Sequence, residues 1–182
     1  MSAAQTFLAA DRLYLRPLES EDADGPYPSW LNDQEICSGN SHHVLPYSRD
    51  AARDYIRSLV AHRDQLTLAI VLREGQQHVG NIALQKWDRL GRSAEFAILL
   101  GERSCWGTGI GFEAAKLVLT HGFTAMNLHR IHCGTFADNA GMIALAKKLG
   151  MSEEGRRREA VFKDGQFVDV VEFGLLKNEY KQ

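Results

Sequence analysis

The stretch from residue 66 to residue 100 constrains the fold of this chain most. Residues 66–72, 79–87 and 94–100 are apolar segments of strand length, and short turn sequences at 74–77 and 90–92 separate them. Apolar runs bounded by glycine and polar residues indicate strands. Consecutive strands with connections this short pair antiparallel. We therefore expect a three-stranded antiparallel meander in the middle of the chain.

Further elements are expected on both sides of the meander. In chain order they are a strand at 13–17, an irregular helix from 20, a helix at 49–60 that Ser48 caps, a helix from 110, a strand at 129–136, a helix from Asn139 to Gly150, and a hairpin at 160–176. Strands and helices in this order predict a mixed α+β fold. No linker, repeat or low-complexity run divides residues 1–182, so a single domain is expected.

Composition and charge limit the classes of molecule that the chain is expected to bind. Apolar residues make up 45% and charged residues 24% of the 182 residues, and the formal net charge is −2. Domains that bind a nucleic-acid backbone are usually basic, so no nucleic-acid partner is expected. The sequence shows no signal peptide and no apolar window that could span a bilayer, so no membrane partner is expected. Three widely spaced cysteines favour reduced thiols and a cytoplasmic location.

Three alternating glycines lie where the strand at 94–100 is followed by the start of the helix near residue 110. Gly107, Gly109 and Gly111 let the backbone approach a ligand closely, and the start of a helix offers free N–H groups to an anion. The Lys-Ser/Thr ending of a P-loop is absent, and the spacing differs from the Gly-x-Gly-x-x-Gly dinucleotide fingerprint. From spacing alone, a plain glycine turn and a site for a diphosphate are equally good interpretations.

At these residues the chain resembles the GNAT superfamily of acetyl-CoA-dependent N-acetyltransferases. The family loop, Gln/Arg-x-x-Gly-x-Gly/Ala, matches residues 106–111, and the segments 94–98, 138–151 and 163–170 are also similar. Trp106 departs from the pattern at its first position, as in the branch that includes ribosomal-protein N-terminal acetyltransferases. The resemblance extends from Arg12 to Tyr180. It implies the GNAT fold, with a largely antiparallel sheet that splays at its centre and is flanked by helices.

The resemblance also implies how acetyl-CoA binds. The pantetheine arm would lie in the gap between the strand at 94–100 and the strand at 129–136, and loop amides would hold the pyrophosphate. The residues implied in cofactor binding are Phe96, Ala97, Ile98, Leu99, Trp106, Gly107, Thr108, Gly109, Ile110, Gly111 and Asn139. Asn139 would bind the arm near the thioester.

Transfer of an acetyl group to an amine requires a base, because only the neutral amine attacks a thioester and an alkylammonium has a pKa of about 10.4. Glu95, beside the expected thioester, is the first candidate. It could instead be a surface carboxylate paired with Arg92 or Lys86. Glu172 and Asp169 are weaker candidates. A backbone N–H near Ile98 could stabilise the negative charge that develops on the carbonyl oxygen.

The acid that protonates the departing thiolate is missing from its usual places. Relatives often carry serine at the position of Gly141 or tyrosine at that of Ala146. An acid could come from Ser104, Tyr180 or water, or the thiolate could leave unaided. No metal is expected, because His129 and His132 would point to opposite faces of a strand.

Trp30, Asp33 and Glu35 are the candidates for binding the acceptor, as an aromatic wall and carboxylates that attract a cationic amine. A buried tryptophan and solvated acids are the alternative. The predicted function is acetyl transfer to a primary amine: a protein N-terminus, a polyamine or other small molecule, or a nucleotide-linked amino sugar. The alternatives are a non-catalytic acetyl-CoA-binding module and a different nucleotide-binding domain. The final hairpin could pair two copies into a homodimer.

Overall fold

The computed structural model describes residues 5–61 and 63–181. Its strands are β1 (Leu8–Ala9), β2 (Leu13–Pro17), β3 (Leu66–Leu72), β4 (His78–Asp88), β5 (Ser93–Leu100), β6 (Arg130–Phe136), β7 (Ser152–Lys163) and β8 (Gln166–Leu176). Its α-helices are α1 (Tyr27–Leu31), α2 (Arg49–Leu59), α3 (Ile110–Thr124) and α4 (Ala140–Lys148), and its 3₁₀ turns are η1 (Ser20–Ala23), η2 (Glu74–Gln76) and η3 (Arg103–Cys105).

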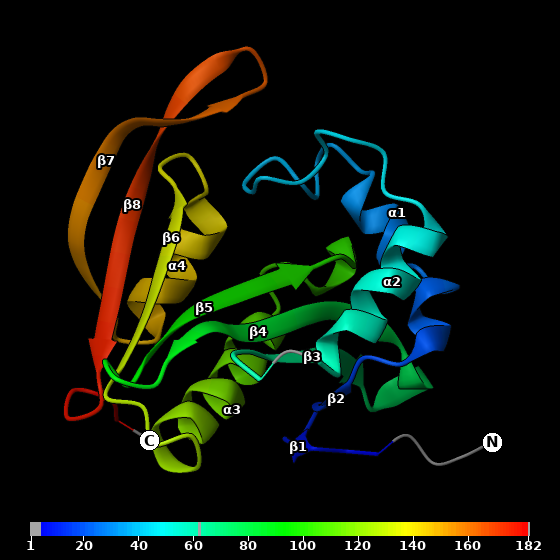
Figure 1. Cartoon of the computed structure of the whole chain (residues 1–182), viewed down its shortest axis with the longest axis horizontal. Helices are drawn as coiled ribbons and strands as arrows, with labels where there is room; N and C mark the ends of the chain where they lie inside the picture. Colours follow the sequence, from blue (N-terminus) through cyan, green and yellow to red (C-terminus); the bar gives the residue numbers. More distant parts are fainter. Residues whose placement is uncertain (1–4, 62, 182) are drawn as a thin grey trace.

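The strands form one eight-stranded sheet in the order β1-β2-β3-β4-β5-β6-β8-β7 (Figure 1). The predicted meander is confirmed, because β3, β4 and β5 are antiparallel neighbours. Among the strands of the described residues, only β5 and β6 pair in parallel. Their connection contains α3, as a parallel crossover requires.

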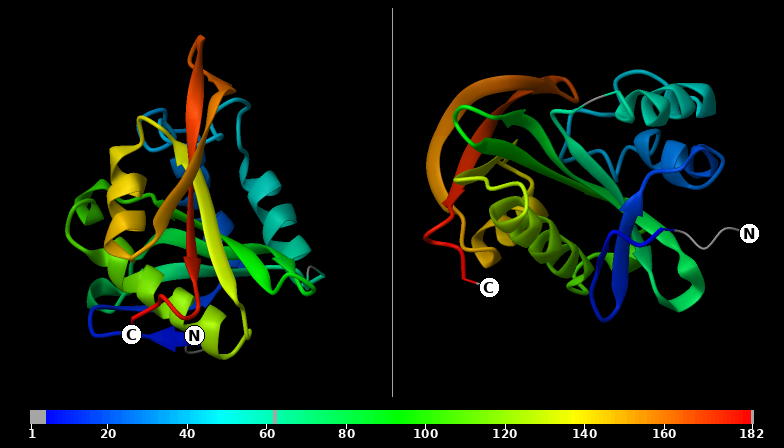
Figure 2. Two further views of the ribbon diagram at one scale, coloured as in Figure 1. Left: turned by 90° about the vertical axis from the view of Figure 1, so that its left-hand side faces the viewer. Right: turned by 60° about the horizontal axis from the view of Figure 1, so that its bottom comes forward.

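Helices cover both faces of the sheet. Figure 2 shows α1 and α2 on one side and α3 on the other. The larger apolar cluster lies on the α3 side and includes Phe96, Leu119, Ile131 and Phe173, each at most 2% exposed. A smaller cluster, centred on Trp30, lies between the sheet and the α1–α2 side. The sheet therefore has two buried faces, which explains why its middle strands are almost continuously apolar.

The sheet opens where its two halves meet. β5 pairs with β6 only from Ser93↔Arg130 to Glu95↔His132. Beyond that point β5 continues along β4 as far as Leu100, while β6 continues along β8 as far as Phe136. The predicted central splay is thereby confirmed, and it begins directly after Glu95.

Two strands differ from the sequence prediction. β7 begins at Ser152, eight residues before the predicted start of the hairpin, and β1 was not predicted. Residues 152–160 are all exposed and mostly charged, so they lack the apolar alternation that marks a half-buried strand. β7 is the outermost strand, where charged side chains protect an open sheet edge.

None of the helices within residues 5–61 and 63–181 has the length and apolar character that a membrane-spanning helix needs.

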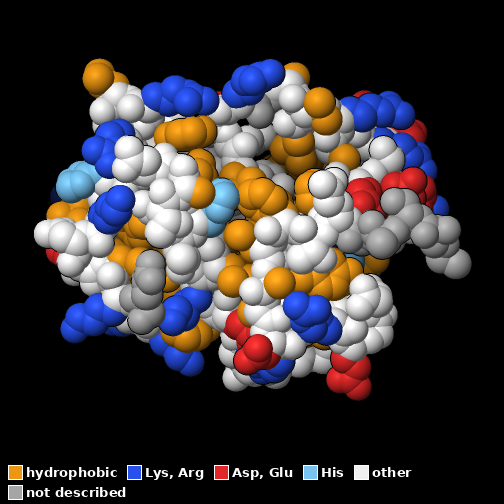
Figure 3. Space-filling model, turned by 90° about the horizontal axis from the view of Figure 1, so that it is seen from below, with side chains coloured by type: hydrophobic (Ala, Val, Ile, Leu, Met, Phe, Trp, Pro, Cys, Tyr) orange, Lys and Arg blue, Asp and Glu red, His pale blue; other side chains and the backbone are white. Residues whose placement is uncertain are grey.

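Figure 3 shows the surface from below. Apolar side chains gather at the centre of this face, and lysine and arginine side chains lie mostly around its margin.

Candidate functional site

The glycine loop lies between η3 and α3, and glycine is required at its three positions for different reasons. Gly107 and Gly109 have φ angles of 72° and 87°, a conformation that L side chains rarely adopt. Gly111 is helical and buried, and a Cβ there would lie 3.1 Å from Leu100 Cδ1. Gly109 is the N-cap of α3 and brings no side chain to the first-turn amides. These amides can therefore bind an external anion.

Arg12 fastens this loop to the start of β2. Its Nη1 donates to the Thr108 carbonyl oxygen at 3.1 Å, and its Nε lies 2.7 Å from Glu113 Oε2. The backbone N–H of Arg12 also donates to Glu113 Oε1 at 3.0 Å. The sequence did not reveal this contact, since no local pattern links Arg12 to a loop so distant along the chain.

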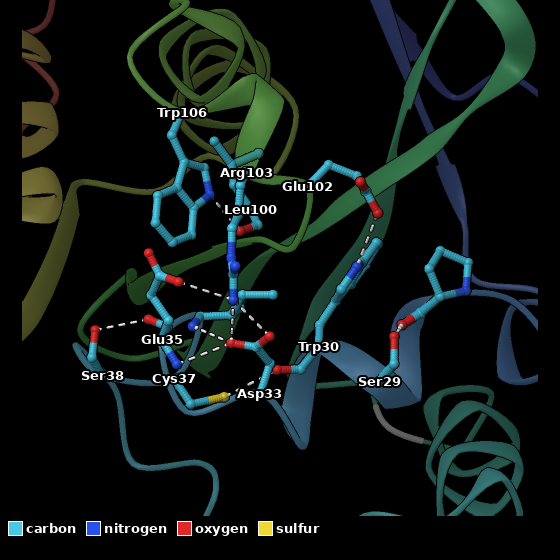
Figure 4. Close-up of polar contacts among 12 residues, drawn as sticks. Ser29, Trp30, Asp33, Glu35, Cys37, Ser38, Leu100, Glu102, Arg103 and Trp106 are labelled. Atoms are coloured by element: carbon cyan, nitrogen blue, oxygen red, sulfur yellow. Dashed lines mark hydrogen bonds and ion pairs between the residues drawn. The ribbon is translucent and has the colours of Figure 1, made fainter.

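Trp106 stands between the loop and the end of β5 (Figure 4). Its indole Nε1 donates to the Leu100 carbonyl oxygen at 2.9 Å, and the residue remains 40% exposed. The side chain at the first position of the glycine loop is thus fixed to the strand that is expected to contact the pantetheine arm.

The open edge of β5 carries the other predicted cofactor residues. Phe96 is buried in the larger core, so its backbone alone can face a ligand, whereas Ala97, Ile98 and Leu99 are half-buried. Cys133 lies across the gap, on β6. Burial, and then the charges of Glu172 and Glu95, raise the pKa of Cys133 to about 12. Its thiol therefore stays protonated and does not serve as a nucleophile.

Glu95 is the last β5 residue that pairs with β6. Its Oε2 lies 2.6 Å from Lys86 Nζ, and 22% of its side chain is exposed. Lys86 has a φ of 53° and lies at a bulge of β4, which directs it toward Glu95. Pairing with Lys86, the alternative considered for Glu95, is therefore present, although the carboxylate still reaches solvent.

The weaker base candidates belong to the β7–β8 hairpin. Glu172 Oε1 accepts a hydrogen bond from Arg157 Nε at 2.7 Å. The backbone N–H of Glu159 most strongly lowers the pKa of Asp169, and Arg156 lowers it further. Both carboxylates are thus held by arginines of the edge strand.

Trp30 corrects one prediction. It is only 3% exposed, so it does not form an open aromatic wall. Its indole covers Gly101, where a Cβ would overlap the ring, and its Nε1 donates to Glu102 Oε1 at 3.2 Å. His78 packs edge-on against it at 5.0 Å. Trp30 is a core residue, as the alternative interpretation held, and it positions the residues after β5.

Asp33 and Glu35 lie in an open pocket of about 640 Å³ and share one cation, Arg103 (Figure 4). The backbone N–H of Ile36 most strongly lowers the pKa of Asp33, and Arg103 lowers it further. Asp164, from the β7–β8 turn, and His43 also line the pocket. Three chain segments thus meet here, beside the turn that leads into the glycine loop.

Asn139 has partners at both ends of its side chain. Its Oδ1 accepts from the Met142 N–H at 3.0 Å and caps α4, as predicted, while Nδ2 donates to the Gly39 carbonyl oxygen at 3.0 Å. A Cβ on Gly39 would collide with this amide. The contact with Gly39 joins α4 to the loop that follows α1, and no local pattern in the sequence predicts it.

Neither position 141 nor position 146, where relatives often carry a hydroxyl, provides an acid for the departing thiolate. Ala146 is fully buried and Gly141 is exposed. The Tyr180 hydroxyl, one of the substitutes considered, is held against α3 by Thr120 at 2.8 Å and by the Lys116 carbonyl oxygen. No group of three His, Cys, Asp or Glu side chains that could hold a metal occurs within residues 5–61 and 63–181.

Comparison with known proteins places this arrangement in a family. A family model described as an acetyltransferase (GNAT) domain matches residues 12–152. The chain belongs to the GNAT acetyltransferases. The uncharacterized N-acetyltransferase p20 of Bacillus licheniformis is 32% identical over 177 residues, covering 95% of this chain and 97% of p20. This GNAT protein is thus an acyltransferase that moves an acetyl group from acetyl-CoA to an amine.

Two further comparisons concern polyamines. The spermidine N(1)-acetyltransferase of Escherichia coli K12 is 28% identical over 172 residues, covering 94% of this chain and 90% of that enzyme. A crystal structure of the Vibrio cholerae spermidine N-acetyltransferase in complex with CoA and spermine has a TM-score of 0.84 at 24% identity, covering 93% and 98% of the two chains. The latter likeness confirms the GNAT fold.

Proposed function

We propose that the GNAT protein binds acetyl-CoA at the junction of β5 with the glycine loop. The observation that carries this proposal is the separation of β5 from β6 directly after Glu95↔His132. It leaves the edge of residues 96–99 of β5 free to contact an extended ligand, beside the amides of residues 107–111, whereas the Leu100 carbonyl oxygen accepts from Trp106 Nε1. Positive φ angles at Gly107 and Gly109 support an anion site in the loop. The Asn139 side chain caps α4 and binds the loop that follows α1. A direct contact between Asn139 and the pantetheine arm is therefore not part of the proposal.

Glu95 is proposed to accept the proton of the amine. Side chains alternate along β5, so Glu95 shares a face with Ala97 and Leu99, opposite the Phe96 face. Leu99 belongs to the cluster on the α1–α2 side. The thioester is expected near Ile98, where a backbone N–H would stabilise its carbonyl oxygen. A strand rises about 3.3 Å per residue, so Glu95 lies roughly 10 Å along β5 from Ile98. Glu95 therefore acts through a short water chain, which its partial exposure admits.

The acceptor is proposed to enter through the pocket of Asp33, Glu35 and Asp164. These carboxylates favour an amine that is cationic in solution and is deprotonated on the enzyme. A peptide N-terminus or a small primary amine fits this description. A polyamine is the second candidate, supported by the spermidine acetyltransferase relatives. The Bacillus subtilis protein YdaF, whose name proposes a ribosomal N-acetyltransferase, is 28% identical over 102 residues and supports the first candidate.

The proposal has three further parts: the domain organisation, the cellular location and the oligomeric state. Residues 1–182 are proposed to form one catalytic domain. The location is cytoplasmic, supported by three free and buried cysteines, Cys37, Cys105 and Cys133. Two copies pair through the β7–β8 hairpin, supported by Phe162 and Phe167, which are 62% and 63% exposed and pack edge to face at 5.2 Å. Sedimentation equilibrium measures the oligomeric state.

The test is thiol release from acetyl-CoA with a panel of peptides, monoamines and polyamines. Once an acceptor is found, Glu95→Gln is compared with wild type across pH 6–10. We expect kcat/KM to fall by about 10²-fold or more. The loss is expected to be largest at low pH, where most of the amine carries the proton that Glu95 removes.

Glu172→Gln is the matched control, since Glu172, on β8, is a carboxylate paired with Arg157, and β6 separates β8 from β5. It should retain the wild-type pH profile. A Glu95→Gln variant with an unchanged pH–rate profile would show that Glu95 is not the base. A wild-type protein that releases no thiol with any amine would overturn the proposed acceptor chemistry as a whole.

A further inference from the structure

One nitrogen atom of Arg103 lies among three carboxylate oxygens in the pocket. Its Nη2 is 2.8 Å from Asp33 Oδ1, 2.7 Å from Asp33 Oδ2 and 3.0 Å from Glu35 Oε2 (Figure 4). A guanidinium Nη carries only two N–H groups, whereas an ammonium carries three. The oxygens therefore surround a point that suits an ammonium at least as well as it suits Arg103.

Asp33 is held in this position without Arg103. Its Oδ1 accepts the backbone N–H groups of Glu35 and Ile36 at 2.9 and 3.0 Å. Removal of the guanidinium would therefore leave the Asp33 carboxylate in place. The lining would then keep three carboxylates, Asp33, Glu35 and Asp164, and no arginine or lysine would remain among the residues that line it.

Arg103 has the advantage of being tethered. It belongs to η3, directly after β5, so its guanidinium has an effective concentration near the carboxylates in the millimolar range or above. An ammonium from solution must displace it to reach the same oxygens. Both partners are partly exposed, at 49% for Arg103 and 35% for Asp33, so this competition takes place in a hydrated site.

We propose that Arg103 is a specificity-determining residue that occupies the subsite for a second ammonium and thereby excludes diamines and polyamines in favour of singly charged amines. The inference rests on the proposed acceptor pocket. It deepens that proposal by choosing between its two acceptor classes. A terminal amine with a neutral neighbouring chain does not need the Asp33–Glu35 subsite, whereas a diamine gains from it only when the guanidinium is absent.

The test compares 1,4-diaminobutane and spermidine with butylamine, which lacks the second charge. Calorimetric dissociation constants, measured with CoA present, and kcat/KM are determined for wild type and Arg103→Gln. We expect Arg103→Gln to bind 1,4-diaminobutane and spermidine roughly two- to fivefold more tightly, which is about what one exposed ion pair contributes. Butylamine binding should change by less than twofold, so that the preference for diamines rises.

Two variants act as controls. Arg103→Lys keeps a tethered cation and should exclude polyamines as wild type does. Asp33→Asn in the Arg103→Gln background removes most of the subsite and should abolish the gain. An unchanged or lower preference for diamines in Arg103→Gln overturns the inference. Because binding is measured separately from thiol release, that result is distinguishable from a failure of the proposed acetyl transfer.

Discussion

Glu113 lies in the first turn of α3, next to the amides proposed to bind the pyrophosphate. A carboxylate is favourable at the start of a helix but repels a phosphate there. Arg12 offsets that repulsion, because its guanidinium bridges Glu113 and the Thr108 carbonyl oxygen. The pair is therefore expected to control how tightly acetyl-CoA binds, although neither side chain belongs to the glycine motif.

Arg12→Ala should raise the KM for acetyl-CoA about fivefold, corresponding to about 1 kcal/mol for an exposed charge pair. The cause is the unneutralised Glu113. The double variant Arg12→Ala/Glu113→Gln should recover most of the loss. Initial rates of thiol release at varied acetyl-CoA give both values. Arg53→Ala, which removes an arginine of α2 paired with Asp24 and Asp50, is the control. A double variant no better than Arg12→Ala would contradict this account.

At the scale of elements, α4 and the loop after α1 are coupled through one side chain. Asn139 caps α4 and also donates to Gly39 in the loop that leads toward the acceptor pocket. Lys163, in the β7–β8 hairpin, donates to the His42 carbonyl oxygen of the same loop at 2.8 Å. The loop is thus held from two sides by elements that lie far along the chain.

Asn139→Ala should lower the free energy of unfolding by about 1–2 kcal/mol, because it removes the helix cap and the bond to Gly39 together. Asn139→Asp keeps the cap oxygen and loses only the donor, so it should cost less. Urea unfolding measures both. Amide hydrogen exchange in residues 37–43 should accelerate in both variants. If exchange there stays at the wild-type rate in Asn139→Ala, the link to Gly39 does not order the loop.

At the scale of the whole molecule, a buried ionic cluster ties β2, η1 and β4 together. Asp22 accepts two hydrogen bonds from Arg16 at 2.8 and 2.7 Å, and its Oδ1 lies 3.3 Å from His78 Nδ1. Burial alone would raise the pKa of Asp22. The hydrogen bonds from Arg16 and the Glu19 N–H, together with the adjacent His78 ring, outweigh it and hold the pKa well below its ordinary value of 3.8.

This shift sets the direction of the pH dependence. A carboxyl whose pKa is lower in the folded chain stabilises the fold above its unfolded pKa, and the stabilisation disappears as the pH falls through the folded value. Asp22→Asn should destabilise the protein by about 3 kcal/mol at pH 7, because it leaves Arg16 buried without its counter-ion. The difference from wild type should shrink below about pH 4.

Urea unfolding at pH 3 to 7 measures this difference. Asp24→Asn is the matched control, since Asp24 is paired with Arg53 at a site where half of its side chain is exposed. It should cost less than about 1 kcal/mol. If Asp22→Asn loses the same free energy at pH 3 and pH 7, the ionised carboxylate is not what stabilises the cluster.

The sequence by itself determined the helices and strands in which apolar side chains recur at helical or strand spacing. The meander, α3 with its glycine loop, and α4 with its Asn139 cap could be predicted because apolar spacing, positive-φ glycines and caps are local properties. The first eight residues of β7 escaped prediction, since an exposed edge strand has no buried face to impose alternation. The spacing of the three glycines left a plain turn and an anion site equally good, and the resemblance to the GNAT loop favoured the anion site.

Tertiary structure alone decided what each candidate side chain faces. Trp30 could be a wall or a core residue, and only packing against Gly101 and His78 buried it. Asp33 and Glu35 indicated an acidic pocket, whereas the structure supplied Arg103 as their cation. Arg12 joined the glycine loop in the same way. Such contacts join residues far apart in the chain, so their energies leave no local trace in the sequence, and only the assembled sheet brings them within hydrogen-bonding distance.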